Sequence, residues 1–179
     1  MNKLITLIQN DPLRLQALDC VYQLDIPNCY LAAGFVRNLV WDHLHHKRKS
    51  TPLNDLDVIY FDKHERDANT YKNIESQLSY LMPELNWQVR NQAIMHNRNG
   101  DKPYTNLLDA MSYWPEKETA VAIKKLNNKE FKCISAFGFD SLFELTVTYN
   151  PKRSITTFNQ RVTSKAWLER WNKLIIIKS

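Results

Sequence analysis

The sequence predicts a mixed α/β (α+β) domain built around one short sheet, and two patterns carry that prediction. In the first half of the chain, short runs rich in β-branched and aromatic residues alternate with segments whose apolar residues recur at helical spacing. Further on, two runs of alternating apolar and polar residues flank a polar turn, which is typical of a β-hairpin. Strands and helices in alternation, followed by a hairpin, predict helices packed on a mixed sheet.

The N-terminal half supplies most of the expected sheet. Residues 3–24 carry apolar side chains at helical spacing, and Asp11-Pro12 divides them into two helices, because Asp caps a helix and Pro fits its first turn. The expected elements then follow in order: a strand over 30–33, a helix over 35–44, a polar loop over 45–54, a strand over 56–61, a helix over 66–81 and a strand over 87–91.

The C-terminal half is expected to add the hairpin and further helices. Asn127-Asn128-Lys129 forms the polar turn between the two hairpin strands. The expected elements are a helix over 104–113, hairpin strands over 119–126 and 130–136, a segment over 140–147 that fits helix or strand, an amphipathic helix over 154–171 and a strand or buried tail over 174–177. In the late helix, Phe158, Trp167 and Trp171 are expected to serve packing.

The composition of the 179-residue chain is that of one globular domain. Hydrophobic residues make up 44%, enough for a core, and this excludes disordered and coiled-coil classes. We expect a single domain over 1–179, with a core over roughly 28–150 and a helical extension over 151–179. Three scattered cysteines and no long apolar run favour a cytoplasmic protein that does not contact a membrane. The net charge of +5 fits a polyanionic partner.

The most informative stretch is Asp55-Leu56-Asp57, at the start of an apolar strand. Alternate side chains of a strand share a face, so both aspartates point the same way while Leu56 points into the core. Two neighbouring carboxylates repel each other, and a hard divalent cation such as Mg²⁺ or Mn²⁺ relieves the repulsion while also binding phosphate oxygens. The alternative is a solvated acid pair, which a bare Asp-x-Asp more often represents.

A second element precedes this strand at the junction Ala33-Gly34-Phe35-Val36-Arg37-Asn38. A glycine at a strand-to-helix junction lets the first backbone N–H groups of the helix approach a phosphate, which the helix dipole also favours. Arg37 lies in the first turn, where it can reach a phosphate or brace a neighbouring carboxylate. Together the two elements predict a phosphate cradle facing a metal platform.

The junction followed by Asp-x-Asp-Val resembles the nucleotidyltransferase superfamily that includes DNA polymerase beta, and especially the head domain of CCA-adding enzymes and bacterial poly(A) polymerases. Further segments resemble a small family of uncharacterised, single-domain bacterial nucleotidyltransferase-like proteins, namely residues 35–42, 55–62, 87–96, 110–122, 136–143 and 161–171. The resemblance implies a nucleotidyltransferase fold with a short mixed sheet flanked by helices. It also implies Mg²⁺-dependent transfer of a nucleoside monophosphate from an NTP to an acceptor hydroxyl, with release of pyrophosphate.

The resemblance also assigns roles to single residues. Asp55 and Asp57 match the catalytic carboxylates that bind metal, and Gly34 matches the glycine of the phosphate loop. Phe35 stands where a second glycine or serine is usual, so its bulk is expected to narrow the cradle. Arg37 and Asn38 complete the predicted nucleotide-binding loop.

The superfamily's third carboxylate, often the general base, is harder to place. It sits on a later strand, and residues 87–91 offer Gln88, Arg90 and Asn91 but no acid. Asp109 and Asp140 are the candidates from elsewhere. A nucleotide-binding module with little or no turnover is therefore the first alternative function. A small RNA-binding protein is the second, based on the net charge and on the basic loop over 43–49.

Three polar residues after the predicted strand over 87–91 are candidates for the pocket wall. We expect Asn91, Gln92 and His96 to line the nucleotide or acceptor pocket, with capping of buried backbone groups as the alternative. His96 is also a candidate general base. The sequence leaves the acceptor open between an RNA and a small molecule. It does not favour tRNA, because the chain lacks the length for the RNA-binding helical domains of CCA-adding enzymes.

Overall fold

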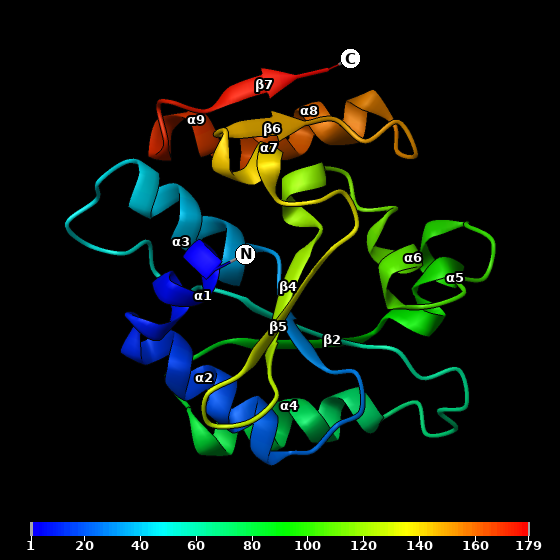
Figure 1. Cartoon of the computed structure of the whole chain (residues 1–179). Coiled ribbons are helices and arrows are strands. Elements are labelled where there is room, and N and C mark those ends of the chain that lie inside the picture. Colours follow the sequence, from blue (N-terminus) through cyan, green and yellow to red (C-terminus); the bar gives the residue numbers. More distant parts are fainter. Residues whose placement is uncertain (1, 179) are drawn as a thin grey trace.

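The computed structural model describes residues 2–178 and arranges them around a five-stranded mixed sheet (Figure 1). The strands are β1 (Tyr30–Ala32), β2 (Leu56–Tyr60), β3 (Trp87–Asn91), β4 (Val121–Lys125) and β5 (Phe131–Ser135), in the order β3-β2-β1-β4-β5. Strand β1 is antiparallel to both β2 and β4, β4 is antiparallel to β5, and β2 is parallel to β3. The prediction of a mixed sheet flanked by helices is therefore confirmed.

The two faces of this sheet differ in how they are covered. One face packs under α1 (Asn2–Gln9), α2 (Pro12–Gln23), α3 (Gly34–Leu44) and α4 (Thr70–Leu81). Its strand residues include Leu31, Val58, Val89 and Ile123, all fully buried. The other face carries a smaller apolar cluster that includes Ala32, Ile59 and Ala122 and packs against α6 (Leu107–Met111). Because side chains alternate along a strand, Asp57 shares this less covered face with Ile59.

The hairpin of β4 and β5 follows the predicted pattern. The pairs run from Val121 with Ser135 to Lys125 with Phe131. In the turn, the Asn127 side chain accepts hydrogen bonds from the backbone N–H of Lys129 at 2.9 Å and of Glu130 at 3.1 Å. An asparagine that bonds its own turn in this way explains why the sequence signal is clear here.

The C-terminal elements lie together at one end of the molecule, yellow to red in Figure 1. They are α7 (Asp140–Phe143), β6 (Thr146–Thr148), α8 (Ile155–Ser164), α9 (Trp167–Arg170) and β7 (Ile175–Ile177). Earlier in the chain lie the short helix α5 (Met95–Asn99) and the 3-10 turns η1 (Gln92–Ile94) and η2 (Lys117–Thr119). The segment over 140–147 is thus helix and then strand. Strand β7 pairs in parallel with β6, so the region after 151 is not purely helical.

The prediction of one continuous helix over 154–171 is wrong, because the helix is interrupted at Ala166. This residue has φ 49° and ψ 41°, in the left-handed region, and it separates α8 from α9. The break turns Trp167 and Trp171 toward Trp41 on α3, with ring centroids 5.8 and 5.2 Å away. Trp171 Nε1 also donates to Asp42 at 2.8 Å. The C-terminal segment is therefore anchored in the main hydrophobic core.

No helix of residues 2–178 is long and apolar enough to cross a membrane.

Ala33 connects β1 to α3 in a backbone conformation that favours glycine, with φ 53° and ψ −119°. The bond from its N–H to Val121 O at 2.9 Å and the bond from Arg37 N–H to its carbonyl at 2.9 Å hold it there. We expect Ala33→Gly to relieve strain and stabilise the protein by about 1 kcal/mol, which raises Tm by roughly 2–4 °C. Differential scanning calorimetry measures this. The control Ala32→Gly, in ordinary strand backbone, should lower Tm, and an unchanged or lower Tm for Ala33→Gly contradicts the strain argument.

Candidate active site

A cleft of about 1040 Å³ opens on the less covered face of the sheet, between the α5–α6 region and the α8–α9 region. Its wall is rich in cations, which are Arg37, Arg90, Arg98, Arg153, Arg161, Lys165 and Arg170. Within residues 2–178, only Asp55 and Asp57 contribute carboxylates to this wall. A cleft with a small acidic centre and a wide basic surround suits a ligand that carries both phosphates and a metal cation.

The two aspartates lie at the start of β2, which pairs with β1 on one side and β3 on the other. Asp57 on β2 is in register with Ala32 on β1 and with Gln88 on β3. Asp55 precedes the strand, is exposed, and accepts a hydrogen bond from Asn86 Nδ2 at 2.6 Å. Burial raises the pKa of Asp57, nearby Arg37 opposes this, and the negative charge of Asp55 adds to the rise. The structure thus brings both carboxylates to the cleft, where their repulsion is only partly offset.

The neighbouring strand carries no acid at the position that faces Asp57. Gln88 and Arg90 on β3 point to the cleft, and Arg90 pairs with Glu75 at 2.9 Å. Asp109 is engaged elsewhere, since it accepts bonds from Thr105 N at 2.8 Å and Thr105 Oγ1 at 3.0 Å, and Asp140 lies in the first turn of α7. The structure therefore places neither candidate third carboxylate on the cleft wall.

At the junction before α3, the side chains of Arg37 and Asn38 lie close to Gly34. A Cβ on Gly34 would lie 3.3 Å from Asn38 Nδ2 and 3.6 Å from Arg37 Nη2, because both side chains fold back over the helix start. Phe35 behaves differently from the prediction. Its ring is 1% exposed and packs in the core beside Arg14, so it points away from the cleft and does not narrow the cradle.

Arg37 connects the start of α3 to the elements around it. Its Nη1 donates to Thr119 Oγ1 at 2.6 Å, and its Nη2 donates to Asn38 Oδ1 at 3.0 Å. The guanidinium also stacks on Trp41 and Trp167, 5.1 and 4.6 Å from the ring centroids. Burial lowers its pKa to about 10, so it stays protonated at neutral pH. Of the two roles expected for Arg37, this geometry favours bracing, since each of its three guanidinium nitrogens already donates to a protein oxygen.

The three polar residues at the end of β3 and just beyond it separate into two groups. Gln92 lies on the cleft wall as expected. Asn91 is buried and caps backbone instead, because its Nδ2 donates to Asp62 O at 2.7 Å and its Oδ1 accepts from Ala93 N at 3.0 Å. His96 on α5 folds back on the preceding turn η1, with Nδ1 2.8 Å from Ala93 O. The prediction that all three line the pocket is therefore corrected for Asn91 and His96.

Sequence reasoning missed the wall that the C-terminal segment supplies. Helix α8 and its C-cap present one polar face to the cleft, made of Thr157, Arg161, Ser164 and Lys165. Spacings of three and four residues place these side chains on one side of a helix, which is a signal that the sequence contains. Arg161 is also ion-paired to Glu116, whose carboxylate is fully buried.

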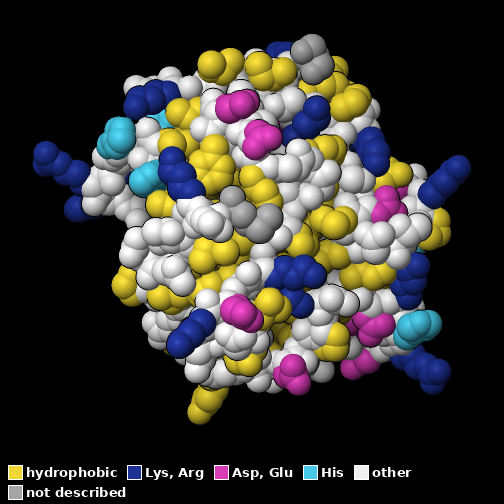
Figure 2. Space-filling view, viewed as in Figure 1, with side chains coloured by type: hydrophobic (Ala, Val, Ile, Leu, Met, Phe, Trp, Pro, Cys, Tyr) yellow, Lys and Arg dark blue, Asp and Glu magenta, His cyan; other side chains and the backbone are white. Residues whose placement is uncertain are grey.

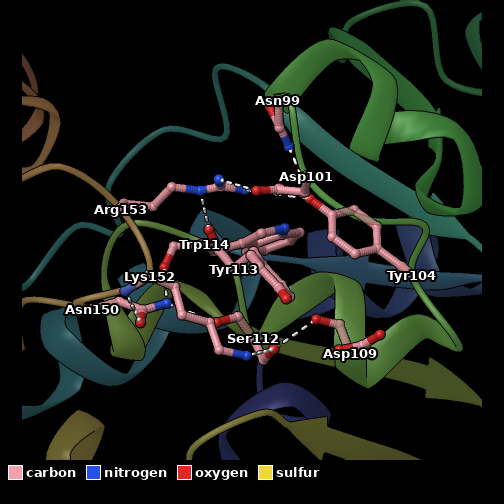
Figure 3. A network of polar contacts seen from close by, with 10 residues as sticks. All are labelled: Asn99, Asp101, Tyr104, Asp109, Ser112, Tyr113, Trp114, Asn150, Lys152 and Arg153. Carbon is pink, nitrogen blue, oxygen red and sulfur yellow. Dashed lines mark hydrogen bonds and ion pairs between the residues drawn. The ribbon is translucent and has the colours of Figure 1, made fainter.

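A network of polar contacts includes several residues of the cleft wall, among them Tyr113 and Arg153 (Figure 3). Arg153 Nη1 and Nη2 donate to the two oxygens of Asp101 at 2.9 and 2.6 Å, and Arg153 Nε donates to Tyr113 O at 2.5 Å. Asn150 Nδ2 donates to the carbonyls of Ser112 and Trp114, both at 2.7 Å. These bonds tie the region around α6 to the segment that leads into α8. The pairing with Arg153 lowers the pKa of Asp101, so the contact is ionic at neutral pH.

The mixed sheet, the glycine at the start of α3 and the aspartate pair at the start of β2 together match the nucleotidyltransferase fold. A family model described as nucleotidyltransferase matches residues 19–176, so the chain belongs to that family. A structure described as revealing a CCA-adding enzyme head domain matches with a TM-score of 0.86 and 26% identity, over 100% of this chain and 96% of that one.

Larger enzymes match in fold. A CCA-adding enzyme solved with CTP has a TM-score of 0.64 at 15% identity, and the match covers 98% of this chain but 43% of that one. A tRNA-processing enzyme in an apo form has a TM-score of 0.53 at 14% identity, covering 90% of this chain and 44% of that one. A search of curated proteins finds no match.

Proposed function

We propose that this protein transfers a nucleoside monophosphate from an NTP to an acceptor hydroxyl and releases pyrophosphate. The observation that carries the proposal is the pair Asp55 and Asp57, facing a cleft whose other charged side chains are all cations among the described residues. Phosphoryl-type transfer asks mainly for positioning and charge neutralisation, and this wall offers both. The family assignment and the CTP complex of a similar fold support an NTP as substrate.

Three buried free cysteines fit a cytoplasmic location.

The residues fit a Mg²⁺ or Mn²⁺ ion. Asp55 and Asp57 are hard oxygen donors whose mutual repulsion a cation relieves, and within residues 2–178 no group of three or more His, Cys, Asp or Glu is placed to hold a metal alone. The remaining ligands would then be water and phosphate oxygens, as Mg²⁺ prefers. The ion supplies neutralisation of the phosphate charge. The first amides of α3 after Gly34 bind phosphate oxygens, and Asn38 and Gln92 orient the nucleotide.

A nucleotide-binding module with slow or no turnover is the second candidate function. Gln88 and Arg90 occupy the cleft positions of β3, where the superfamily has its third carboxylate, so no side chain on that strand removes a proton from the acceptor. Release of pyrophosphate in the presence of an acceptor separates the two functions. The acceptor is proposed as an RNA or a small molecule with a free hydroxyl.

A small RNA-binding protein is less well supported. On the face that Figure 2 shows, Lys and Arg side chains are interspersed with Asp and Glu and do not merge into one broad basic patch. Six arginines and one lysine line the cleft that contains the two aspartates. Charge placed around a metal-binding centre favours a metal–nucleotide complex over a simple RNA surface.

The proposal is tested by the melting temperature of the wild type with Mg²⁺, with each NTP, and with both. Ligand at about 100 times its Kd stabilises by roughly 2.7 kcal/mol, and for a chain of this size this raises Tm by roughly 5–11 °C. We expect a rise that needs both Mg²⁺ and NTP and that EDTA reverses. The matching nucleoside, which lacks phosphates, serves as the control. No rise with any NTP contradicts both nucleotide functions.

A further inference from the structure

Arg161 is held in an orientation that leaves part of its guanidinium free. Its Nε and Nη2 donate to the two carboxylate oxygens of Glu116, at 2.6 and 3.2 Å. Glu116 is fully buried, while the Arg161 side chain is 35% exposed and lies on the cleft wall. Among the described residues none accepts a bond from Nη1. One side of the guanidinium is therefore fixed by the protein, and the remaining donors are left to the cleft.

The wall that carries Arg161 belongs to the same cleft as the aspartate pair. Arg161 on α8 and Lys165, the C-cap residue one turn later, line this cleft together with Asp55 and Asp57. Thr157 lies on the same face, one turn before Arg161. The phosphates of a nucleotide bound at Asp57 would therefore lie between the sheet and this helix face.

A contribution to stability does not by itself explain the ion pair between Arg161 and the buried Glu116. Burying Glu116 costs desolvation energy that an ion pair often does not recover, so such a pair is weak support for stability. A fixed guanidinium, however, loses little side-chain entropy when it bonds a phosphate, and its planar fork matches phosphate oxygens. Glu116 balances the charge of Arg161, so the net positive charge on this wall comes from Lys165.

We infer that Arg161 binds the phosphate chain of the nucleotide and that Glu116 is the positioning residue that orients it. The inference rests on the proposed function, and it names which side chain holds the triphosphate. It also explains why the chain beyond residue 151 is part of the site: α8 supplies the wall opposite the aspartates.

Isothermal titration with Mg²⁺·tripolyphosphate as the probe tests this inference, because that probe has phosphates but no base or sugar. We expect Arg161→Gln to weaken binding roughly 10- to 100-fold, the loss typical of hydrogen bonds to a charged group. Arg161→Lys should not restore it, since one ammonium cannot bond Glu116 and a phosphate in the same geometry. Glu116→Gln should weaken binding by a smaller factor. The control Arg66→Gln removes the same charge from an exposed position outside the cleft and should bind like the wild type.

A folding defect is separated from a binding defect by a double variant. Arg161→Gln alone leaves a buried carboxylate unpaired, whereas Glu116→Gln/Arg161→Gln removes both charges at similar volume. The double variant should melt closer to the wild type than Arg161→Gln does, and still bind the probe as weakly. If the wild type binds Mg²⁺·NTP and Arg161→Gln binds the probe equally well, the inference is overturned and the proposed function stands. If the wild type binds neither ligand, both fail.

Discussion

Asp57→Asn is expected to raise the Tm of the metal-free protein at neutral pH and to abolish stabilisation by Mg²⁺ and NTP. The fold raises the pKa of Asp57 above its ordinary value of 3.8, chiefly by burial and also through Asp55. The folded state therefore holds this proton more tightly than the unfolded state does. The charged carboxylate lowers the free energy of unfolding at every pH above the raised pKa, and asparagine removes that penalty while also removing a metal ligand.

The measurement is Tm against pH for the two proteins without metal. The difference in Tm between Asp57→Asn and the wild type should reach its full size above the raised pKa of Asp57. It should shrink as the pH falls through that pKa toward 3.8. Glu84→Gln, which removes one negative charge at an exposed site, is the control and should show no such pattern. A lower Tm for Asp57→Asn at neutral pH would mean that attraction to Arg37 outweighs burial and the repulsion by Asp55.

Arg37→Ala is expected to produce the largest loss of stability, about 3 kcal/mol, which lowers Tm by roughly 6–12 °C. Arg37 is buried, it bonds Thr119 and Asn38, and it stacks on Trp41 and Trp167. Its removal leaves a cavity and two polar groups without their partner. It also loosens the contact between α3 and the C-terminal segment.

Denaturant unfolding of the purified variant measures this loss. Arg48→Ala, at an exposed position of the loop after α3, is the control and should change the free energy of unfolding by less than about 0.5 kcal/mol. The free energy of unfolding of Arg37→Lys should lie between those of Arg37→Ala and Arg48→Ala. Lysine keeps the charge but lacks the planar guanidinium that reaches Thr119 and Asn38 together. A Tm for Arg37→Ala equal to that of Arg48→Ala contradicts the bracing role.

The sequence predicted the central strands, the hairpin and the aspartate pair because each rests on a local pattern. The alternation along Leu56–Tyr60 fixes which side chains share a face, and Asn127 bonds within its own turn. Contacts between distant residues were not predictable in this way. The break at Ala166 comes with a hydrogen bond from Trp171 to Asp42, 129 residues earlier, whereas the periodicity of 154–171 alone indicates one helix.

The site shows the same division between local and distant determinants. Asp55 and Asp57 are recognisable from their spacing, whereas Arg161 acquires its orientation from Glu116, 45 residues earlier in the chain. Phe35 and Asn91 lie beside true cleft residues in sequence, but the direction of each side chain depends on packing. The ring of Phe35 belongs to the core, and Asn91 is committed to the loop after β2.

Asp55 and Asp57 are proposed to bind a metal ion together with an NTP. Titration with Mn²⁺ tests this, followed by the loss of the electron paramagnetic resonance signal of the free ion, with NTP present and the binding by NTP alone subtracted. We predict Mn²⁺ binding to the wild type and to Glu84→Gln that is lost in Asp55→Asn and in Asp57→Asn. Equal Mn²⁺ binding by all four proteins, or none by the wild type, would contradict the claim.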